Sequence, residues 1–149
     1  MTTWAEFEAA APTLATRGRE LLYRGDAGEA LLATVRDDQP PRIHPVNVEI
    51  VDGHLYAFIL GSAKRTDLEG DGRYALHTHQ DPVAPSEFAV RGHATVVDSD
   101  AARATAAAQW SFDIDEGYTL FEFSISSALL GVRETADDWP PRYSSWRAP

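Results

Sequence analysis

The sequence contains no cysteine, and this absence excludes disulfide bonds, thiolate metal sites, iron–sulfur clusters and cysteine nucleophiles. It also has no apolar run near the roughly 20 residues that a membrane-spanning helix needs. Residues 1–6 lack the basic and apolar segments of a signal peptide. We therefore expect a cytoplasmic protein with no membrane partner.

Positive charge is scarce as well. The chain has 13 basic and 23 acidic residues, for a net charge of −10 at pH 7. Such a surface repels the phosphate backbone of nucleic acids and the headgroups of anionic lipids, so we expect no nucleic-acid partner. Arginine supplies all of the basic residues except one, so that Lys64 is the only lysine.

What the chain does contain is an ordinary globular composition. Of its 149 residues, 44% are hydrophobic and 24% are charged, which is typical of a folded domain with its own core. The length fits one domain, and there are neither internal repeats nor low-complexity segments. We therefore treat residues 1–149 as a single domain.

The spacing of apolar residues predicts helices at the N-terminus and mostly strands thereafter. From Trp4 to Leu21 apolar residues recur at intervals of three and four, and Pro12 should divide this segment into two helices. Two further helices are expected at 63–69 and 101–110. Apolar runs and alternation between turn signals predict strands at 30–35, 42–51, 55–60, 74–79, 87–98, 118–125 and 128–134. The predicted class is α+β, dominated by an antiparallel sheet, and either a closed barrel or a sandwich fits it.

The segment Gly61–Arg65 (GSAKR) is the best candidate for a functional site. Ser62 stands at the N-cap of a predicted helix, whose first amides and dipole favour an anion. Lys64 and Arg65 place two cations in that first turn, where they oppose the dipole unless an anion lies between them and the amides. Arg42, at the start of a predicted strand, could reach the same anion. This pattern favours a phosphate site, although the start of a solvated surface helix could carry the same residues.

Two histidines on one strand face, His77 and His79, have the spacing of a metal-ligand pair. No motif supplies a third ligand, so we predict no metal site. The sequence also has no nucleophile elbow, Walker motif or dinucleotide fingerprint. The aromatic tail, with Trp139, Tyr143 and Trp146, could close over a flat ring or pack on the barrel or on a second subunit.

Several segments together resemble the pyridoxamine 5′-phosphate oxidase-like family of FMN-binding split barrels. The resemblance covers roughly residues 4–97 and is looser toward the C-terminus. It rests on the order and spacing of 30–35 (ALLATV), 42–46 (RIHPV), 52–56 (DGHLY), 61–64 (GSAK), 67–68 (DL), 73–76 (RYAL) and 90–94 (VRGHA). It implies an antiparallel split β-barrel of six to seven strands with N-terminal and peripheral helices. It also implies a homodimer that binds flavin at the subunit interface.

The resemblance implies roles for individual residues. Arg42, Ser62 and Lys64 would hold the phosphate of FMN. Arg65 would stand in for a second basic residue that the oxidase carries where this chain has Ala63. The isoalloxazine ring would lie along residues of two neighbouring strands, namely His44, Pro45, Val46, Asn47, Phe58 and Leu60.

The implied function is that of an FMN-dependent oxidoreductase with a small-molecule substrate. His44 is the best candidate for a proton donor near the ring. The oxidase itself uses an Arg-x-His sequence near its C-terminus for its vitamin substrate, whereas no histidine follows His93 here, so we do not expect pyridoxamine phosphate as the substrate. Two alternatives stay open: the deazaflavin coenzyme F-420 on the same fold, and a cofactor-free or ligand-binding homodimer without catalysis.

Overall fold

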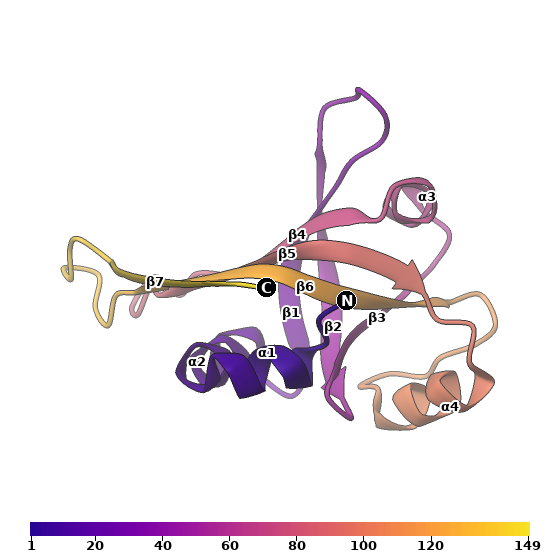
Figure 1. Ribbon diagram of the computed structural model, residues 1–149, viewed down its shortest axis with the longest axis horizontal. Helices are drawn as coiled ribbons and strands as arrows, with labels where there is room; N and C mark the ends of the chain where they lie inside the picture. Colours follow the sequence, from indigo (N-terminus) through magenta and orange to yellow (C-terminus); the bar gives the residue numbers. More distant parts are fainter.

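The computed structural model describes residues 1–149 and contains four α-helices and seven β-strands (Figure 1). The helices are α1 (Trp4–Ala10), α2 (Pro12–Leu22), α3 (Ala63–Gly70) and α4 (Asp100–Gln109). The strands are β1 (Gly28–Thr34), β2 (Arg42–Val51), β3 (His54–Ile59), β4 (Arg73–Thr78), β5 (Glu87–Val96), β6 (Thr119–Val132) and β7 (Arg142–Arg147). None of the helices is both long and apolar enough to span a membrane. The cytoplasmic location stays a prediction.

Local signals in the sequence define the two N-terminal helices. Thr3 and Glu6 form a capping box, in which the Thr3 amide donates to the Glu6 carboxylate (2.7 Å) and the Glu6 amide donates to the Thr3 hydroxyl (3.3 Å). Pro12 is the first residue of α2, a position at which no backbone N–H is needed. The predicted division into two helices at Pro12 is confirmed.

The strands form one antiparallel sheet in the order β3-β2-β1-β4-β5-β6-β7. β3 also pairs with β6, from Tyr56–Glu122 to Ile59–Thr119, and this pairing closes the first six strands into a barrel. β7 lies outside the barrel, on the second half of β6. The predicted antiparallel barrel with peripheral helices is confirmed, and the sandwich is excluded.

β6 runs without a break through Thr119–Val132, where the sequence pattern predicted two strands, 118–125 and 128–134. The prediction of two strands is wrong because β6 stays extended through Ser126 and Ser127, although Ser126 has no partner on β5. Ser127 pairs with Arg91 of β5 on one edge and with Arg147 of β7 on the other. The Ser126 carbonyl accepts from the Ala148 amide (2.9 Å), so the pairing with the C-terminal segment continues past Ser127.

The pairing of β5 with β6 is irregular at this point. Arg91 of β5 pairs with Ser127, whereas the next residue, Gly92, pairs with Ile125, so Ser126 of β6 is the extra residue. A Cβ atom at Gly92 would collide with the carbonyl oxygen of Ser124, so only glycine allows the two strands to approach so closely. The bend or bulge predicted at this glycine is confirmed.

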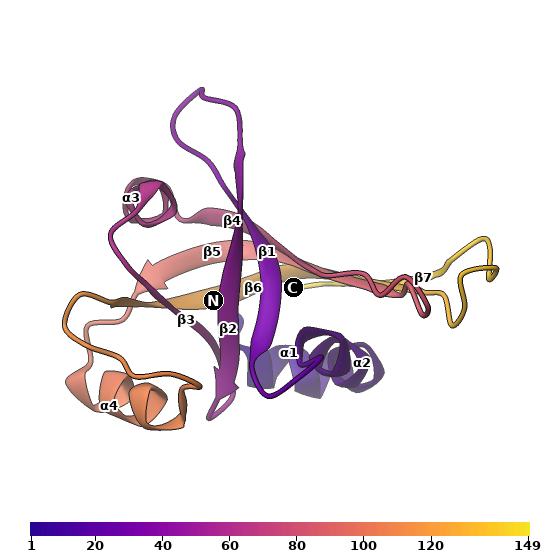
Figure 2. The ribbon, with the colours of Figure 1, turned by 180° about the vertical axis from the view of Figure 1, so that it is seen from behind.

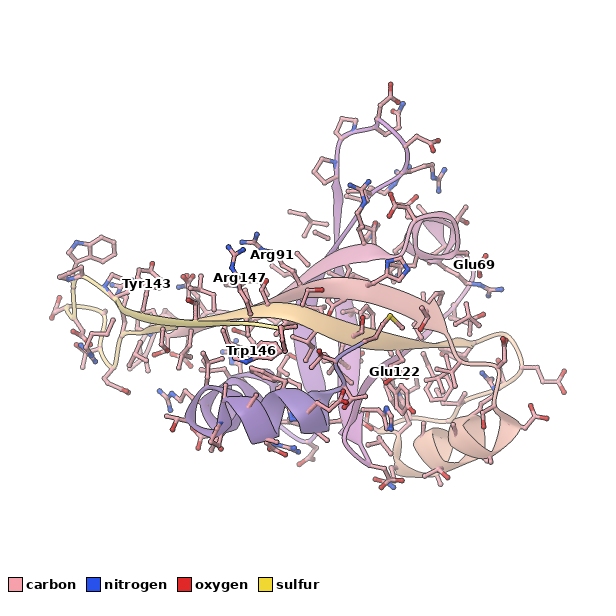
Figure 3. All side chains as sticks on the ribbon, in the orientation of Figure 1. Glu69, Arg91, Glu122, Tyr143, Trp146 and Arg147 are labelled. Carbon is pink, nitrogen blue, oxygen red and sulfur yellow. The ribbon has the colours of Figure 1, made fainter.

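The main hydrophobic cluster has 22 buried residues, which come from the strands of the barrel and from α1, α2 and α3 (Figure 1). The rings of Trp4, Phe7 and Phe88 lie with their centroids 5.3 to 6.4 Å apart. Trp146 of β7 joins them, 5.1 Å from Phe7, on the side of the sheet that faces α1 (Figure 3). Of the alternatives for the aromatic tail, packing on the chain's own barrel is confirmed for Trp146.

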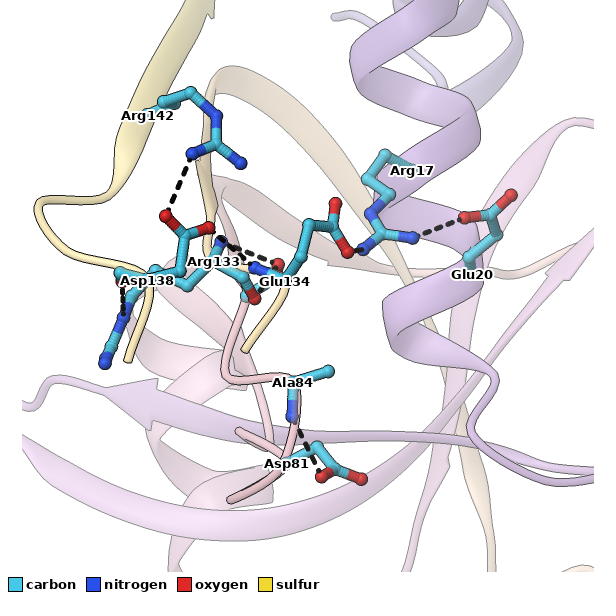
Figure 4. Close-up of polar contacts among 9 residues, drawn as sticks. Arg17, Glu20, Asp81, Ala84, Arg133, Glu134, Asp138 and Arg142 are labelled. Carbon is cyan, nitrogen blue, oxygen red and sulfur yellow. Dashed lines mark hydrogen bonds and ion pairs between the residues drawn. The ribbon is translucent and has the colours of Figure 1, made fainter. Parts of the chain in front are cut away.

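Ion pairs connect the turn between β6 and β7 to α2. Arg17 donates to Glu20 (3.1 Å) and to Glu134 (3.3 Å), and Arg142 donates to Asp138 (3.1 Å) (Figure 4). All of these side chains are partly exposed, so each pair adds little to stability. They orient the turn, whereas the hydrophobic cluster holds the fold together.

A second, smaller cluster lies outside the barrel, beneath α4. Its buried members are Val51, Tyr56, Phe58, Ala106, Trp110 and Leu120. Phe58 meets Trp110 edge to face with the ring centroids 4.8 Å apart, and the guanidinium of Arg103 lies 5.2 Å from the centre of the Phe58 ring. α4 therefore covers the outer surface of β3 and the start of β6.

Candidate functional site

The start of α3 forms around a serine, as the sequence predicts. Ser62 is the N-cap: its hydroxyl accepts from the Arg65 amide (3.4 Å) and donates to the Leu60 carbonyl (2.9 Å). α3 lies at one end of the barrel, near the loop that joins β1 to β2 (Figure 2). The cap therefore fixes the first turn of α3 at that end of the barrel.

A buried carboxylate joins α3 to β1 and β2. Asp67, whose side chain has no exposed surface, accepts from the Thr34 hydroxyl (2.8 Å), from Arg36 Nε (2.6 Å) and from Arg42 Nε (3.0 Å). Burial alone would raise the pKa of Asp67. The hydrogen bonds from Thr34 and Arg36 and the two guanidinium charges outweigh burial and hold that pKa below its usual value. The carboxylate is therefore ionised at neutral pH.

Lys64 lies half-buried in the first turn of α3, and its ammonium group forms no ion pair with any carboxylate. Burial, followed by the positive charges of Lys64 and Arg42, lowers the pKa of His44 against the opposing effect of Asp67. His44 is therefore neutral at pH 7, and its Nε2 atom is buried without a hydrogen-bond partner. Three predicted site residues thus come together at this end of the barrel.

The first part of β2 forms an unpaired strand edge next to these cations. Arg42–Val48 pairs with β1 along one edge. On the other edge, β2 pairs with β3 only over Glu49–Val51, beyond which β3 diverges to join β6 (Figure 2). Along such a strand, alternate residues direct their N–H and C=O groups away from the partner. The chain thus offers free backbone donors and acceptors beside Arg42.

Three other predicted residues, Pro45, Val46 and Asn47, line a shallow hollow on β2. Glu29 and His79 complete its lining. Val46 is half-buried against the core, and the Asn47 amide donates across to a backbone carbonyl of β1 (3.4 Å). These residues follow His44 along the strand, as the resemblance implies, and their part in cofactor binding stays a prediction.

Two predicted residues have their side chains engaged elsewhere. Phe58 is buried and packs against Trp110 under α4. Arg65 donates through Nε to Glu69 (2.8 Å) and through a terminal nitrogen to the Gly117 carbonyl (3.2 Å). Any role of these two side chains toward a cofactor stays a prediction.

His77 of β4 has partners within the chain, whereas His79 lies beyond the end of that strand. A ring nitrogen of His77 lies 2.6 Å from the Thr78 carbonyl, and the other lies 3.2 Å from Glu87. No three His, Asp or Glu side chains converge as metal ligands do. The ionic groups that converge near α3 are arginines and a lysine around one carboxylate.

Sequence reasoning missed Thr34, Arg36 and Asp67. Asp67 follows Lys64 by three residues, which is the spacing of an ordinary surface ion pair on a helix and gives no sign of a buried carboxylate. One signal does exist: Thr34 falls on the inward face of β1, where a hydroxyl needs a partner. Arg36 lies in the turn after β1, where no periodic pattern applies.

These groups define what the site can hold. The cations outnumber the single carboxylate, and the amides at the start of α3 add partial positive charge. The unpaired edge of β2 adds directional donors and acceptors. Together they suit a planar, hydrogen-bonding ligand that carries a phosphate or a similar anion.

No protein-family model and no curated protein matches the sequence. Solved structures match the fold. A protein from Clostridium acetobutylicum, related to general stress protein 26 and of the pyridoxinephosphate oxidase family, has a TM-score of 0.65 and 14% identity, over 91% of this chain and 94% of that one. The FAD binding protein from Mycobacterium smegmatis has a TM-score of 0.61 and 15% identity, over 90% and 96%. A heme binding protein from the same organism has a TM-score of 0.62 and 18% identity over 87% of this chain, which spans 57% of that protein's length.

These similar structures share one architecture, although their names give different bound groups, FAD and heme. Identities below 20% establish the fold and not the ligand. The resemblance seen in the sequence is confirmed at that level. The chain has the split β-barrel fold of the pyridoxamine 5′-phosphate oxidase family.

Proposed function

We propose that this chain binds FMN and acts as an oxidoreductase on a small molecule. The observation that carries the proposal is the position of Arg42 and Lys64 at the start of α3, next to the unpaired edge of β2. FMN joins a phosphate to a flat ring whose rim carries hydrogen-bond donors and acceptors. The cations suit the phosphate, and the strand edge suits the rim of the ring.

Individual residues of the chain have the free atoms that this proposal needs. Arg42 uses only Nε for Asp67, so both of its terminal nitrogens are free to donate to phosphate oxygens. Lys64 adds a second, unpaired charge. The Ser62 hydroxyl is occupied by capping, so its part is to fix the first amides of α3. Bound FMN would supply the hydride and electron transfer, and the protein would supply position and electrostatics.

We propose His44 as the residue that holds or moves a proton near the ring. Its pKa is lowered chiefly by burial, so the neutral imidazole can both donate and accept at pH 7. Its Nε2 atom is buried and has no partner within the chain, and such an unsatisfied polar group favours contact with a ligand. His44→Gln should slow turnover more than it weakens FMN binding, and equal losses in both would contradict this role.

We further propose that the active form is a homodimer. An apolar row crosses the outer face of three strands: Ala33 of β1 pairs with Ile43 of β2 and Ala75 of β4, and Leu31 pairs with Pro45. Ile43 is 69% exposed in the single chain. A second copy would remove this apolar surface from water.

The first experiment is a titration that distinguishes the cofactors. The dialysed protein is titrated with FMN, riboflavin, the deazaflavin coenzyme F-420 and heme, while the quenching of tryptophan fluorescence is followed. The proposal predicts saturation by FMN at micromolar concentration and weaker binding of riboflavin, which lacks the phosphate. Saturation by the deazaflavin coenzyme or by heme alone would assign the fold to that cofactor. Saturation by none would favour a cofactor-free, ligand-binding homodimer.

Activity needs a separate measurement on the FMN-loaded protein. A reduced nicotinamide should bleach the visible absorbance of the bound flavin, and an electron acceptor should restore it. A bound flavin that no nicotinamide or dithiol reduces would contradict the oxidoreductase proposal and leave FMN binding intact.

A further inference from the structure

Asp67 is the least exposed charged residue of the chain. It stands in the middle of α3, next to the core residue Leu68. Burying a carboxylate is unfavourable unless donors replace its water. Three donors do so within 3.0 Å: the Thr34 hydroxyl and the Nε atoms of Arg36 and Arg42. These contacts fix two arginines from β2 and the preceding loop at the start of α3.

Both arginines approach Asp67 through Nε, and this geometry leaves their terminal nitrogens for another acceptor. Arg42 has both terminal nitrogens without a partner in the chain. Arg36 gives one to the Ala63 carbonyl (3.4 Å) and keeps the other free. Their side chains are 39% and 41% exposed, so the free ends of the guanidinium groups reach solvent beside the first turn of α3.

The local charge is unbalanced. The two arginines share a single carboxylate and Lys64 pairs with none, while Arg65 in the same turn is already paired with Glu69 (2.8 Å). Two positive charges therefore lack a counter-charge, in a chain whose net charge is −10. A phosphate monoester carries close to two negative charges at pH 7, whereas a phosphodiester carries one.

We infer that Asp67 is a positioning residue that orients Arg36 and Arg42 toward one anion. With Lys64, the two arginines bind the dianion of a phosphate monoester. The inference rests on the proposed function, and it adds to it a binding residue, Arg36, and a positioning residue, Asp67. In this arrangement Arg36 takes the role that the sequence suggested for Arg65.

Asp67→Asn separates positioning from simple electrostatics. The amide keeps the shape of the side chain and an acceptor for the Thr34 hydroxyl, but it no longer anchors two guanidinium groups. If net charge alone mattered, loss of a negative charge would strengthen FMN binding. We expect the reverse, a loss of about ten- to a hundredfold in FMN affinity. Riboflavin affinity should stay unchanged, because riboflavin has no phosphate to be held.

Arg36→Gln and Arg73→Gln form a matched pair, because each removes one positive charge from a partly exposed arginine that pairs with an aspartate, and Arg73 pairs only with Asp71. We expect R36Q to weaken FMN binding about tenfold and to leave riboflavin binding unchanged. R73Q should change neither. Thermal unfolding followed by circular dichroism shows whether each variant is folded. If D67N does not fold, R36Q alone tests the inference, since the Arg36 side chain is partly exposed and its replacement should leave the fold intact.

Each other outcome overturns the inference. Equal or tighter FMN binding by folded D67N would overturn it, as would equal effects of R36Q and R73Q on FMN affinity. A parallel loss of FMN and riboflavin affinity in D67N would show a purely structural role. Equal affinity of the unaltered protein for the two flavins would overturn the inference and leave flavin binding intact, whereas saturation by neither flavin would overturn the proposed function as well.

Discussion

The two parts of β2 differ although they belong to one continuous strand. In the second part Val48 and Val51 are buried, and the amide of Ile50, which lies beyond the end of β1, still finds an acceptor in the Tyr23 hydroxyl (2.7 Å). In the first part, Arg42–Asn47 is exposed or half-buried, and one edge has no partner strand. The second part stabilises the fold, and the first part is available to a ligand. Variants in the two parts should therefore affect different measurements.

The largest expected effect lies on the structural side of this comparison. Leu55 of β3 is fully buried and pairs with Ile50 of β2. Leu55→Ala should lower the free energy of unfolding by about 2–5 kcal/mol, because it removes buried methyl groups and leaves a cavity. Urea unfolding measures this change. The folded variant should bind FMN as the unaltered protein does. A loss of FMN affinity would contradict the proposal that the second part of β2 stabilises the fold and the first part binds the ligand.

The next effect lies on the ligand side. Lys64→Ala should weaken FMN binding by about 1.5–3 kcal/mol, the size of a charge-assisted hydrogen bond, and should change the free energy of unfolding by less than about 0.5 kcal/mol. Fluorescence titration and urea unfolding test the two parts. Arg73→Ala is the matched control, since Arg73 pairs only with its neighbour Asp71 and should not affect FMN. Unchanged FMN affinity in the lysine variant would refute the phosphate assignment.

A third variant tests the outer face of the first part of β2. Ile43→Glu should dissociate the proposed dimer, because it places a charge in the apolar row, while an exposed site leaves monomer stability within about 0.5 kcal/mol. Sedimentation velocity measures the oligomeric state. Val83→Glu is the control, as Val83 is similarly exposed at 76% but lies in the loop before β5. The dimer proposal fails if the unaltered protein sediments as a monomer or if both variants behave alike.

The smallest effect concerns the link between β2 and α3. The folded-state pKa of Asp67 lies below its usual value of 3.8. Its ion pairs therefore contribute their full stability above that pH, and the contribution is lost as the pH falls through the folded-state pKa. Urea unfolding at a series of acidic pH values should show a steeper loss of stability in the unaltered protein than in D67N. If stability fell equally steeply with pH in both proteins, protonation of Asp67 would not be coupled to unfolding.

The parts of the fold that local chemistry determines are predictable from the sequence. Asp52 and Gly53 adopt positive φ angles of 50° and 80°, as a two-residue hairpin turn requires, and β2 spans Arg42–Val51 as predicted. Ser62 caps α3 through its own side chain. Each of these features depends on residues within a few positions of one another.

Features set by distant contacts are not predictable in this way. The Thr34–Asp67 bond joins residues 33 positions apart, and no helical or strand period relates them. The burial of Phe58 under α4 is unpredictable for a different reason. Because α4 covers the outer face of β3, Leu55–Ile59 is buried throughout, and the alternation of apolar residues does not distinguish the two faces of the strand. Arg42, Lys64 and the strand β2 of the candidate site were therefore predictable, whereas Arg36 and the carboxylate that joins it to Arg42 were not.

The pairing of β3 with β6 also has a consequence for how the protein is made. α3, β4, β5 and α4 all lie between these two strands in the sequence. On the ribosome, β3 emerges long before its partner, and the barrel stays open until Thr119–Glu122 has left the exit tunnel. During that interval an apolar strand has a free edge, the condition under which nascent chains pair wrongly with one another. The protein is thus protected from aggregation only once β6 is free to pair with β3.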